Sequence, residues 1–380
     1  MANHSSLTGV ATRRSHAVTN HVVPNHAAEH ADSVLAPEGY WHIALPRWGY
    51  RFLLEKRALA VNMGLLVALL AACLLYLSLG SVPLAPSAVI PAVLGKGDMM
   101  TAFMVQELRL PRLMAACFTG AAFALSGILM QTLARNRLAT PGIIGIDNGA
   151  TAFAVASIVG MGVSIAPPAM ALVGATSAAV LTFGLAAGSG TQGYRFIVAG
   201  IGVGAMFGAV TQLMLARVAI DTANAAYPWT VGSLNARPGG AVHLLGIGLA
   251  LGIIAALALA RSLTLLRFND ATASGLGVRV KARRLQVLML SVVLTAFAVA
   301  VAGPVGMVAL IGPEIARSLS SARQVPILAA TLAGALVMVL ADLAGRTLLA
   351  PIEIPVGIVT AVVGGPWLLW ILMRPQRSRP

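Results

Sequence analysis

Long apolar runs separated by short polar segments make up most of the chain. Each run approaches the ~20 residues that a helix needs to cross a bilayer. Backbone groups in lipid must be hydrogen-bonded within the protein, which a helix achieves by itself. The pattern therefore predicts ten membrane-spanning helices. Their expected ranges are 58–80, 111–134, 143–161, 168–187, 194–217, 241–261, 285–302, 304–320, 326–347 and 354–373.

The eighth predicted span, residues 304–320, is short and broken by Gly312-Pro313, so its existence needs separate support. Basic residues collect in loops on the cytoplasmic side of a membrane. With ten spans and both termini inside, most of the 26 Lys and Arg residues lie inside, whereas nine spans give a more even split. Ten spans leave outside only Lys96, Arg109, Arg112, Arg217, Arg237 and Arg346.

Composition supports a polytopic, all-α membrane protein. Of the 380 residues, 58% are hydrophobic and only 10% are charged, against about 25% charged residues in soluble domains. The net charge of +14 does not indicate nucleic-acid binding, because the basic residues lie between apolar runs, where they set topology. Two cysteines within apolar runs provide no disulfide framework.

Residues 1–50 differ from the rest of the chain. They are polar and Ala-rich, without apolar periodicity, and they contain six of the seven histidines. We expect a disordered cytoplasmic tail, followed by a transmembrane domain over residues 51–375 and a short cytoplasmic tail over 376–380. A metal-sensing role built on His21, His26 and His30 is an alternative, although no ligand geometry is fixed.

A charged island lies between the sixth and seventh predicted spans, from Arg261 to Arg284. The charge count places it on the cytoplasmic side. We interpret it as the contact for an energy-supplying partner, with its basic residues fixing the ends of the flanking spans. The partner contact is narrowed to residues 268–278, where Asp270 is the only acid. Its candidate residues are Phe268, Asp270, Ala273, Ser274, Gly275, Leu276, Gly277 and Val278.

Two arginines, Arg109 and Arg112, flank Leu110-Pro111 at the outer start of the second span. Proline suits the first turn of a helix, and the two arginines share one helix face. They could anchor the helix at the membrane interface, or receive an acidic partner from outside.

Two other pairs are spaced for contact on one helix face: Glu314 with Arg317, and Asp342 with Arg346. The fifth span contains Gly200, Gly204 and Met206. Its small residues could widen a pathway or allow close helix packing.

Many motifs in order resemble the FecCD-type permeases, the membrane subunits of bacterial ABC importers for iron siderophores, haem and vitamin B12. The resemblance covers about residues 58–375. The matching segments are 109–112, 120–127, Gln131, 135–141, Gly145 with Gly149-Ala150, Trp229 with 232–235, Ala273 with 276–278, 302–306 with Pro313 and 315–317, 341–346, and 353–361. Segments 232–235 and 315–317 are most similar to ferric-enterobactin permease subunits. Glu314 departs from the His or Gln that relatives often have there.

The resemblance implies a BtuC-like type II ABC importer permease fold in the bacterial cytoplasmic membrane. It also implies a second permease subunit, a paralogue rather than a copy, with two cytoplasmic ATPases and an extracytoplasmic siderophore-binding protein. In relatives, basic residues matching Arg109, Arg112 and Arg346 receive acidic groups of the binding protein. The helix matching the fifth span lines the pathway, with Gly193 and Tyr194 at its inner gate.

The expected function is therefore a permease subunit for a ferric siderophore, without catalytic residues or a resident metal. The chain has no Gly-x-x-x-x-Gly-Lys-Ser/Thr loop, so ATP and Mg²⁺ would bind to the partner ATPase. One alternative keeps the family but changes the cargo to vitamin B12 or haem. Another is an ion-coupled transporter, which should show buried carboxylates at mid-membrane; Asp147, Glu314 and Asp342 lie near helix ends instead.

Overall fold

The computed structural model describes residues 38–45, 50–80, 82–160, 165–186, 194–235, 237–321 and 323–373. The chain divides into two compact units, Met1–Leu54 and Glu55–Pro380. Most of the predicted N-terminal tail and the C-terminal tail lie outside the described residues. At the end of the N-terminal segment, strands β1 (Tyr40–Leu45) and β2 (Tyr50–Glu55) pair in a two-stranded sheet. Regular structure therefore begins before residue 50.

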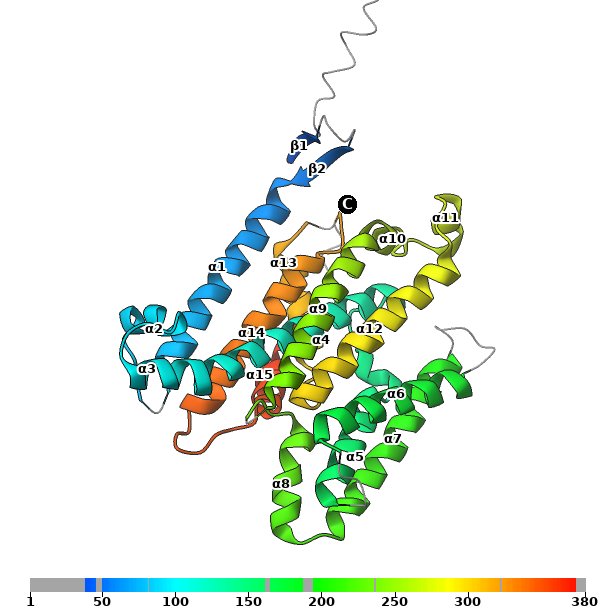
Figure 1. The fold of residues 1–380 in the computed structure, drawn as a ribbon. Helices are drawn as coiled ribbons and strands as arrows, with labels where there is room; N and C mark the ends of the chain where they lie inside the picture. The colour runs from blue at the N-terminus through cyan, green and yellow to red at the C-terminus, as the bar shows by residue number, and fades with distance from the viewer. Residues whose placement is uncertain are drawn as a thin grey trace, which may run out of the picture. The chain divides into compact units, whose positions relative to one another are not determined.

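All ten predicted spans coincide with helices (Figure 1). Among the described residues, seven helices are long and apolar enough to cross a membrane. Helices α5, α13 and α15 are shorter than the length required for that count. Helix α13 starts later than expected because residues 303–307 form a turn with Gly303 at φ +74°. The ten helices are α1 (Lys56–Ser78), α4 (Leu110–Ala134), α5 (Ile146–Val159), α6 (Pro167–Leu185), α7 (Tyr194–Ala216), α9 (Gly239–Ala258), α12 (Val280–Ala302), α13 (Val308–Leu319), α14 (Ile327–Thr347) and α15 (Val356–Met373).

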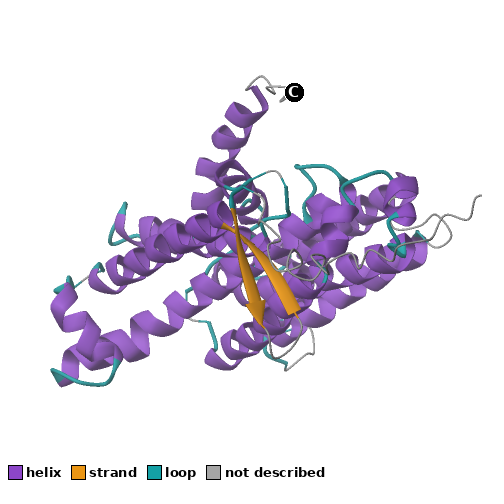
Figure 2. Ribbon diagram, turned by 90° about the horizontal axis from the view of Figure 1, so that it is seen from above, coloured by secondary structure: helices purple, strands orange, loops and turns teal. Residues whose placement is uncertain are grey.

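Short helices in the connections were not predicted from the sequence. Within the described chain, β1 and β2 are the only strands, and every other regular element is helical (Figure 2). Because short helices carry weak periodicity, their existence depends on packing and capping. They are α2 (Pro86–Val93), α3 (Met99–Phe103), the π-helix η2 (Met104–Arg109), the 3₁₀ helix η3 (Pro141–Ile144), α8 (Ile220–Val231), α10 (Ala260–Leu265) and α11 (Asp270–Gly275).

Helix α4 forms the centre of the larger unit, packed against α12, α13 and α14. Close approach depends on glycine. A Cβ on Gly120 would lie 2.4 Å from the carbonyl oxygen of Gly334 in α14, and one on Gly127 would lie 2.0 Å from that of Ala309 in α13. Small residues at helix contacts allow this approach in a bilayer, where packing rather than water exclusion drives association.

Buried hydroxyl groups add polar contacts between α4 and α12. The Ser126 Oγ lies 2.8 Å from the Ser291 Oγ and 2.6 Å from the Thr295 Oγ1, and all three side chains are buried. Each hydroxyl therefore has a partner in an environment where an unpaired polar group would be costly. The cluster fixes the two helices side by side at their middle.

Candidate functional site

The structure brings the three predicted docking arginines together at the end of the bundle where α4 begins. They line one cavity of about 400 Å³ with Glu107 and Glu353. Segments distant in sequence form this cavity: η2, the first turn of α4, the loop before α9, the end of α14 and the loop before α15. The expected spatial cluster therefore exists, although its members differ in what they contact.

Arg112 makes the central ion pair of this cluster. Its Nε and Nη2 donate to the two carboxylate oxygens of Asp342 at 2.9 and 3.0 Å. The Tyr76 hydroxyl donates to the same carboxylate at 2.6 Å, and the Asp342 residue is 1% exposed. The pairing of Asp342 with Arg346 expected from their spacing is therefore wrong. The carboxylate instead joins α14 to α4 and α1.

Arg112 also reaches the outside of the cluster, where its Nη1 donates to Glu353 at 2.8 Å. The Glu353 side chain is 45% exposed. One guanidinium thus satisfies a buried carboxylate and an accessible one together. The accessible partner is the one that an external acidic group could replace.

Arg109 is 6% exposed and is bound to the backbone of the last turn of α1 and of the segment after it. Its guanidinium donates to the carbonyl oxygens of Leu77, at 2.5 Å, and Val82. The last carbonyls of a helix have no partner within the helix, so Arg109 satisfies part of the end of α1. Burial argues against the interpretation of Arg109 as a free docking residue.

Arg346 is half-buried, as is Arg112. Its guanidinium carbon lies 4.7 Å from the centroid of the Tyr76 ring, a distance at which the ring attracts a cation. Gly80 leaves the space: a Cβ there would lie 3.1 Å from Nη2 of both Arg109 and Arg346. Among the described residues, neither Arg109 nor Arg346 forms an ion pair, but Arg109 is buried and bound to backbone carbonyls, so Arg346 is the most suitable of the three for an external acid.

Sequence reasoning missed Arg237, which lines the same cavity. Its guanidinium stacks over the Trp229 ring at 4.1 Å, and its Nε donates to the Ser233 carbonyl oxygen at 2.9 Å. Burial lowers the pKa of Arg237 to about 10. Its Nη2 is buried without a hydrogen-bond partner among the described residues. The sequence did offer one signal for Arg237: it is one of the few basic residues on the predicted outer side.

At the other end of α4, the predicted coupling segment forms the short helix α11. Asn269 caps it by accepting a hydrogen bond from the Thr272 amide at 2.7 Å. Ala273 is buried, whereas Phe268 and Leu276 are 53% and 54% exposed. A Cβ on Gly275 would meet nothing within 4 Å. The segment therefore presents an apolar, uncovered face at the end of the bundle.

Asp270 holds α11 to the bundle. Arg284, in α12, donates to its two oxygens at 2.7 Å each, and Arg135 donates at 2.6 Å. These hydrogen bonds, with Arg284 first, lower the pKa of the exposed Asp270 carboxyl. Asp270 is thus bound to two arginines of this chain, while its side chain remains 53% exposed.

Arg135 is directed to Asp270 by the way α4 ends. It adopts the left-handed conformation with φ +51°, and the Asn136 amide donates back to the Gln131 carbonyl oxygen at 3.1 Å. This arrangement is a common helix C-cap, usually with glycine at the left-handed position. The ion pair with Asp270 and the hydrogen bond from Arg135 Nε to the Leu266 carbonyl oxygen explain an arginine there.

The predicted gate is only partly described. Gly193 lies outside the described residues, and Tyr194 begins α7. Gly200 and Gly204 are buried, with Cβ positions that would lie 2.3 Å from the Ile143 carbonyl oxygen and 3.2 Å from the Asn148 Nδ2. Met206 is 48% exposed. The glycines therefore serve helix packing, and they do not share a face with Met206.

The Glu314–Arg317 pair expected from the sequence is confirmed, with Arg317 Nη2 donating to the Glu314 carboxylate at 2.9 Å. The Nη1 of Arg137 lies 3.6 Å from the other carboxylate oxygen of Glu314. Among the described residues, no group of three His, Cys, Asp or Glu side chains could hold a metal ion.

A family model described as the FecCD transport family matches residues 68–374. The ferric enterobactin transport system permease protein FepG of Escherichia coli (strain K12) is 36% identical over 326 residues, 86% of this chain and 99% of that protein. The achromobactin transport system permease protein CbrC of Dickeya dadantii (strain 3937) is 36% identical over 322 residues, covering 83% and 91% of the two chains.

A solved structure, described as an inward-facing conformation of a metal-chelate type ABC transporter, has a TM-score of 0.72 and 25% sequence identity. The match covers 84% of this chain and 100% of that chain. The similarity extends over nearly the whole helical bundle. It confirms the fold class expected from the sequence.

The buried ion pair should be needed for stability. Asp342→Asn leaves the Arg112 charge without its buried partner, and breaking such a pair costs about 3–5 kcal/mol of the free energy of unfolding. Glu353→Gln removes only the exposed partner of the same arginine and should cost less than about 1 kcal/mol. Denaturant unfolding of the purified protein measures both. Equal losses in the two variants would contradict the structural role given to Asp342.

Proposed function

The chain belongs to the FecCD transport family, and from that premise we propose that it is the permease subunit of a bacterial ABC importer for a ferric siderophore. The similarity to a ferric enterobactin permease over 99% of that protein's length carries the proposal. The bundle of apolar helices supports a multi-pass membrane protein. We place it in the cytoplasmic membrane with both termini inside, as the distribution of basic residues favours.

ATP hydrolysis would take place on two copies of a separate ATPase, because this chain has no phosphate-binding loop of the Gly-x-x-x-x-Gly-Lys-Ser/Thr type. ATP and Mg²⁺ thus belong to that partner. A second permease subunit, a paralogue of this chain, would complete the pathway. An extracytoplasmic siderophore-binding protein would deliver the cargo.

The binding protein would dock where α4 begins. Arg346 offers its guanidinium directly, and Arg112 can exchange Glu353 for an acidic group of the partner. Charge-assisted pairs of this kind orient a partner as well as bind it. Arg109 supports the surface from below by fixing the chain that leaves α1.

The ATPase would press on α11 through Phe268 and Leu276. Force applied to α11 passes to α12 through Arg284 and to the end of α4 through Arg135. These two helices are also joined at their middle by the Ser126 hydroxyl cluster. Movement of α11 would therefore shift α4 and α12 together, which suits a switch of a bundle between two packed arrangements.

The cargo could instead be vitamin B12 or haem within the same family. An ion-coupled transporter is the alternative from another class, and one observation favours it. Asp147, at the start of α5, keeps a buried carboxylate oxygen without a hydrogen-bond partner among the described residues. The other two candidate carboxylates, Asp342 and Glu314, form ion pairs with arginines.

The energy source distinguishes an ABC importer from an ion-coupled transporter. Uptake of a ferric siderophore by cells that depend on this permease should stop when ATP is depleted and should continue when a protonophore collapses the proton gradient at constant ATP. Radioactive iron accumulation measures both. Uptake that survives ATP depletion but stops with the protonophore would overturn the ABC importer proposal.

Arg346→Glu should weaken docking of the binding protein by at least about tenfold, because it replaces attraction for an acidic group by repulsion. Arg217→Glu is the matched control: it makes the same charge change at an exposed residue after α7, on the same predicted outer side, and should stay within about twofold. Surface plasmon resonance with the reconstituted importer gives both affinities. Equal losses would refute the assignment of Arg346 as a docking residue.

Gly275→Trp should uncouple ATP hydrolysis from transport. The space around Gly275 is open, so the chain should fold, but the indole would stand between α11 and the ATPase. We expect siderophore transport by proteoliposomes to fall by about tenfold or more, with docking of the binding protein unchanged. Gly275→Ala adds one methyl group and should transport normally. Normal transport by Gly275→Trp would remove α11 from the coupling surface.

A further inference from the structure

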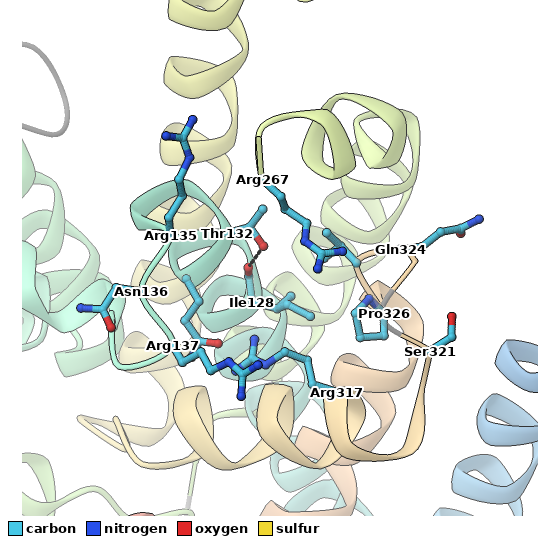
Figure 3. Close-up of a pocket in the computed structure, with 12 residues that line it drawn as sticks. Ile128, Thr132, Arg135, Asn136, Arg137, Arg267, Arg317, Ser321, Gln324 and Pro326 are labelled. Carbon is cyan, nitrogen blue, oxygen red and sulfur yellow. Dashed lines mark hydrogen bonds between the residues drawn. The ribbon is translucent and has the colours of Figure 1, made fainter. Parts of the chain in front are cut away.

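A second cavity, of about 290 Å³, lies at the end of the bundle where α4 finishes. Its wall is formed by the last turns of α4, the loop that follows α4, the end of α13, the loop between α13 and α14, and the segment between α10 and α11 (Figure 3). The coupling contact proposed above uses the apolar face of α11, whereas this cavity is lined by other residues. What this cavity binds is therefore independent of the contact proposed for α11.

Arginines dominate the wall of this cavity. Arg135, Arg137, Arg267 and Arg317 line it, and no carboxylate does. Figure 3 shows the guanidinium groups of Arg137 and Arg317 close together, with Arg267 extending toward them from across the cavity and Arg135 directed elsewhere. Arg137 and Arg317 share a single carboxylate, Glu314, just outside the wall. The cavity is therefore positively charged, and an anion would complete it.

A buried acceptor lies in the same wall. Gln131 is 4% exposed, and its Nε2 donates to the Ala309 carbonyl oxygen at 3.1 Å. Its Oε1 is buried and has no hydrogen-bond partner among the described residues. A buried acceptor without a donor is costly. A ligand that fits this cavity should therefore carry negative charge for the arginines and a hydroxyl or amine hydrogen for Gln131 Oε1.

Apolar residues complete the wall: Ile128, Val325 and Pro326. Inorganic ions need no such contact, but an ester group or the start of an acyl chain would use it. Arginine binds phosphate oxygens in a bidentate manner. Basic pockets at the cytoplasmic ends of membrane helices commonly hold phospholipid headgroups.

We propose that this cavity binds a phosphate group whose neighbouring hydroxyl or amine donates to Gln131 Oε1. Arg137, Arg267 and Arg317 hold the phosphate oxygens. Two sources carry this chemistry: the headgroup of an anionic phospholipid such as phosphatidylglycerol, and a soluble phosphate compound. Neither source depends on the transported cargo, so the site stands or falls independently of the siderophore assignment.

The test uses the full-length chain purified in detergent. Native mass spectrometry measures binding of phosphatidylglycerol and of phosphatidylcholine, and titration calorimetry measures binding of inorganic phosphate and glycerol 3-phosphate. The double variant Arg137→Gln/Arg267→Gln should lower phosphatidylglycerol affinity by about tenfold for each arginine removed. Arg261→Gln is the matched control, because it removes an exposed arginine of α10 that does not line the cavity; its affinity should change by less than about twofold.

Preference for phosphatidylglycerol over phosphatidylcholine, lost in the double variant and kept in the control, establishes a lipid site. Binding of the soluble phosphates with the same dependence, and no greater affinity for phosphatidylglycerol, establishes a soluble ligand. Should the double variant not purify in a folded form, Arg137→Gln alone carries the test, since that side chain is 67% exposed. Binding of neither probe, or equal losses in the control, overturns the proposal.

Discussion

The carboxylate of Asp342 is the interaction on which the rest of the bundle depends. It is buried in α14, receives hydrogen bonds from Tyr76 of α1 and Arg112 of α4, and so joins three helices at one point. A buried charge is tolerated only when it is paired and hydrogen-bonded. This requirement fixes how α1, α4 and α14 meet, and it thereby places Arg109 and Arg346 beside the same cavity.

Helix α4 connects the two ends of the bundle at which we propose contacts with partner proteins. Its 25 residues span about 37 Å at 1.5 Å per residue. Arg112 lies in its first turn and Arg135 caps its end, so one rigid element lines the arginine cavity at one end and is bound to α11 at the other. Its glycine contacts with α13 and α14 hold it close to both neighbours. A displacement of one end of α4 would therefore be transmitted to its other end.

The ten spans could be predicted because apolar runs of membrane length are a strong pattern, and all ten are helices. Which charged side chains form ion pairs was harder to predict. Helical spacing paired Asp342 with Arg346, yet tertiary packing supplied Arg112 from a distant helix, which no local spacing encodes. The same limit applies to Asp270, expected to face a partner but held by two arginines. Arg237 was missed because its stacking on Trp229 of α8 arises only in the folded chain.

The distance in sequence between Arg112 and Asp342, 230 residues, has a consequence for biogenesis. The ribosome makes α4 long before α14, so a charged arginine enters the membrane region while its carboxylate does not yet exist. Until α14 is inserted, that guanidinium must be satisfied by lipid headgroups, water or the translocation machinery. The Arg112–Asp342 ion pair can therefore form only after α14 has been synthesised, which makes this contact a late step in the assembly of the bundle.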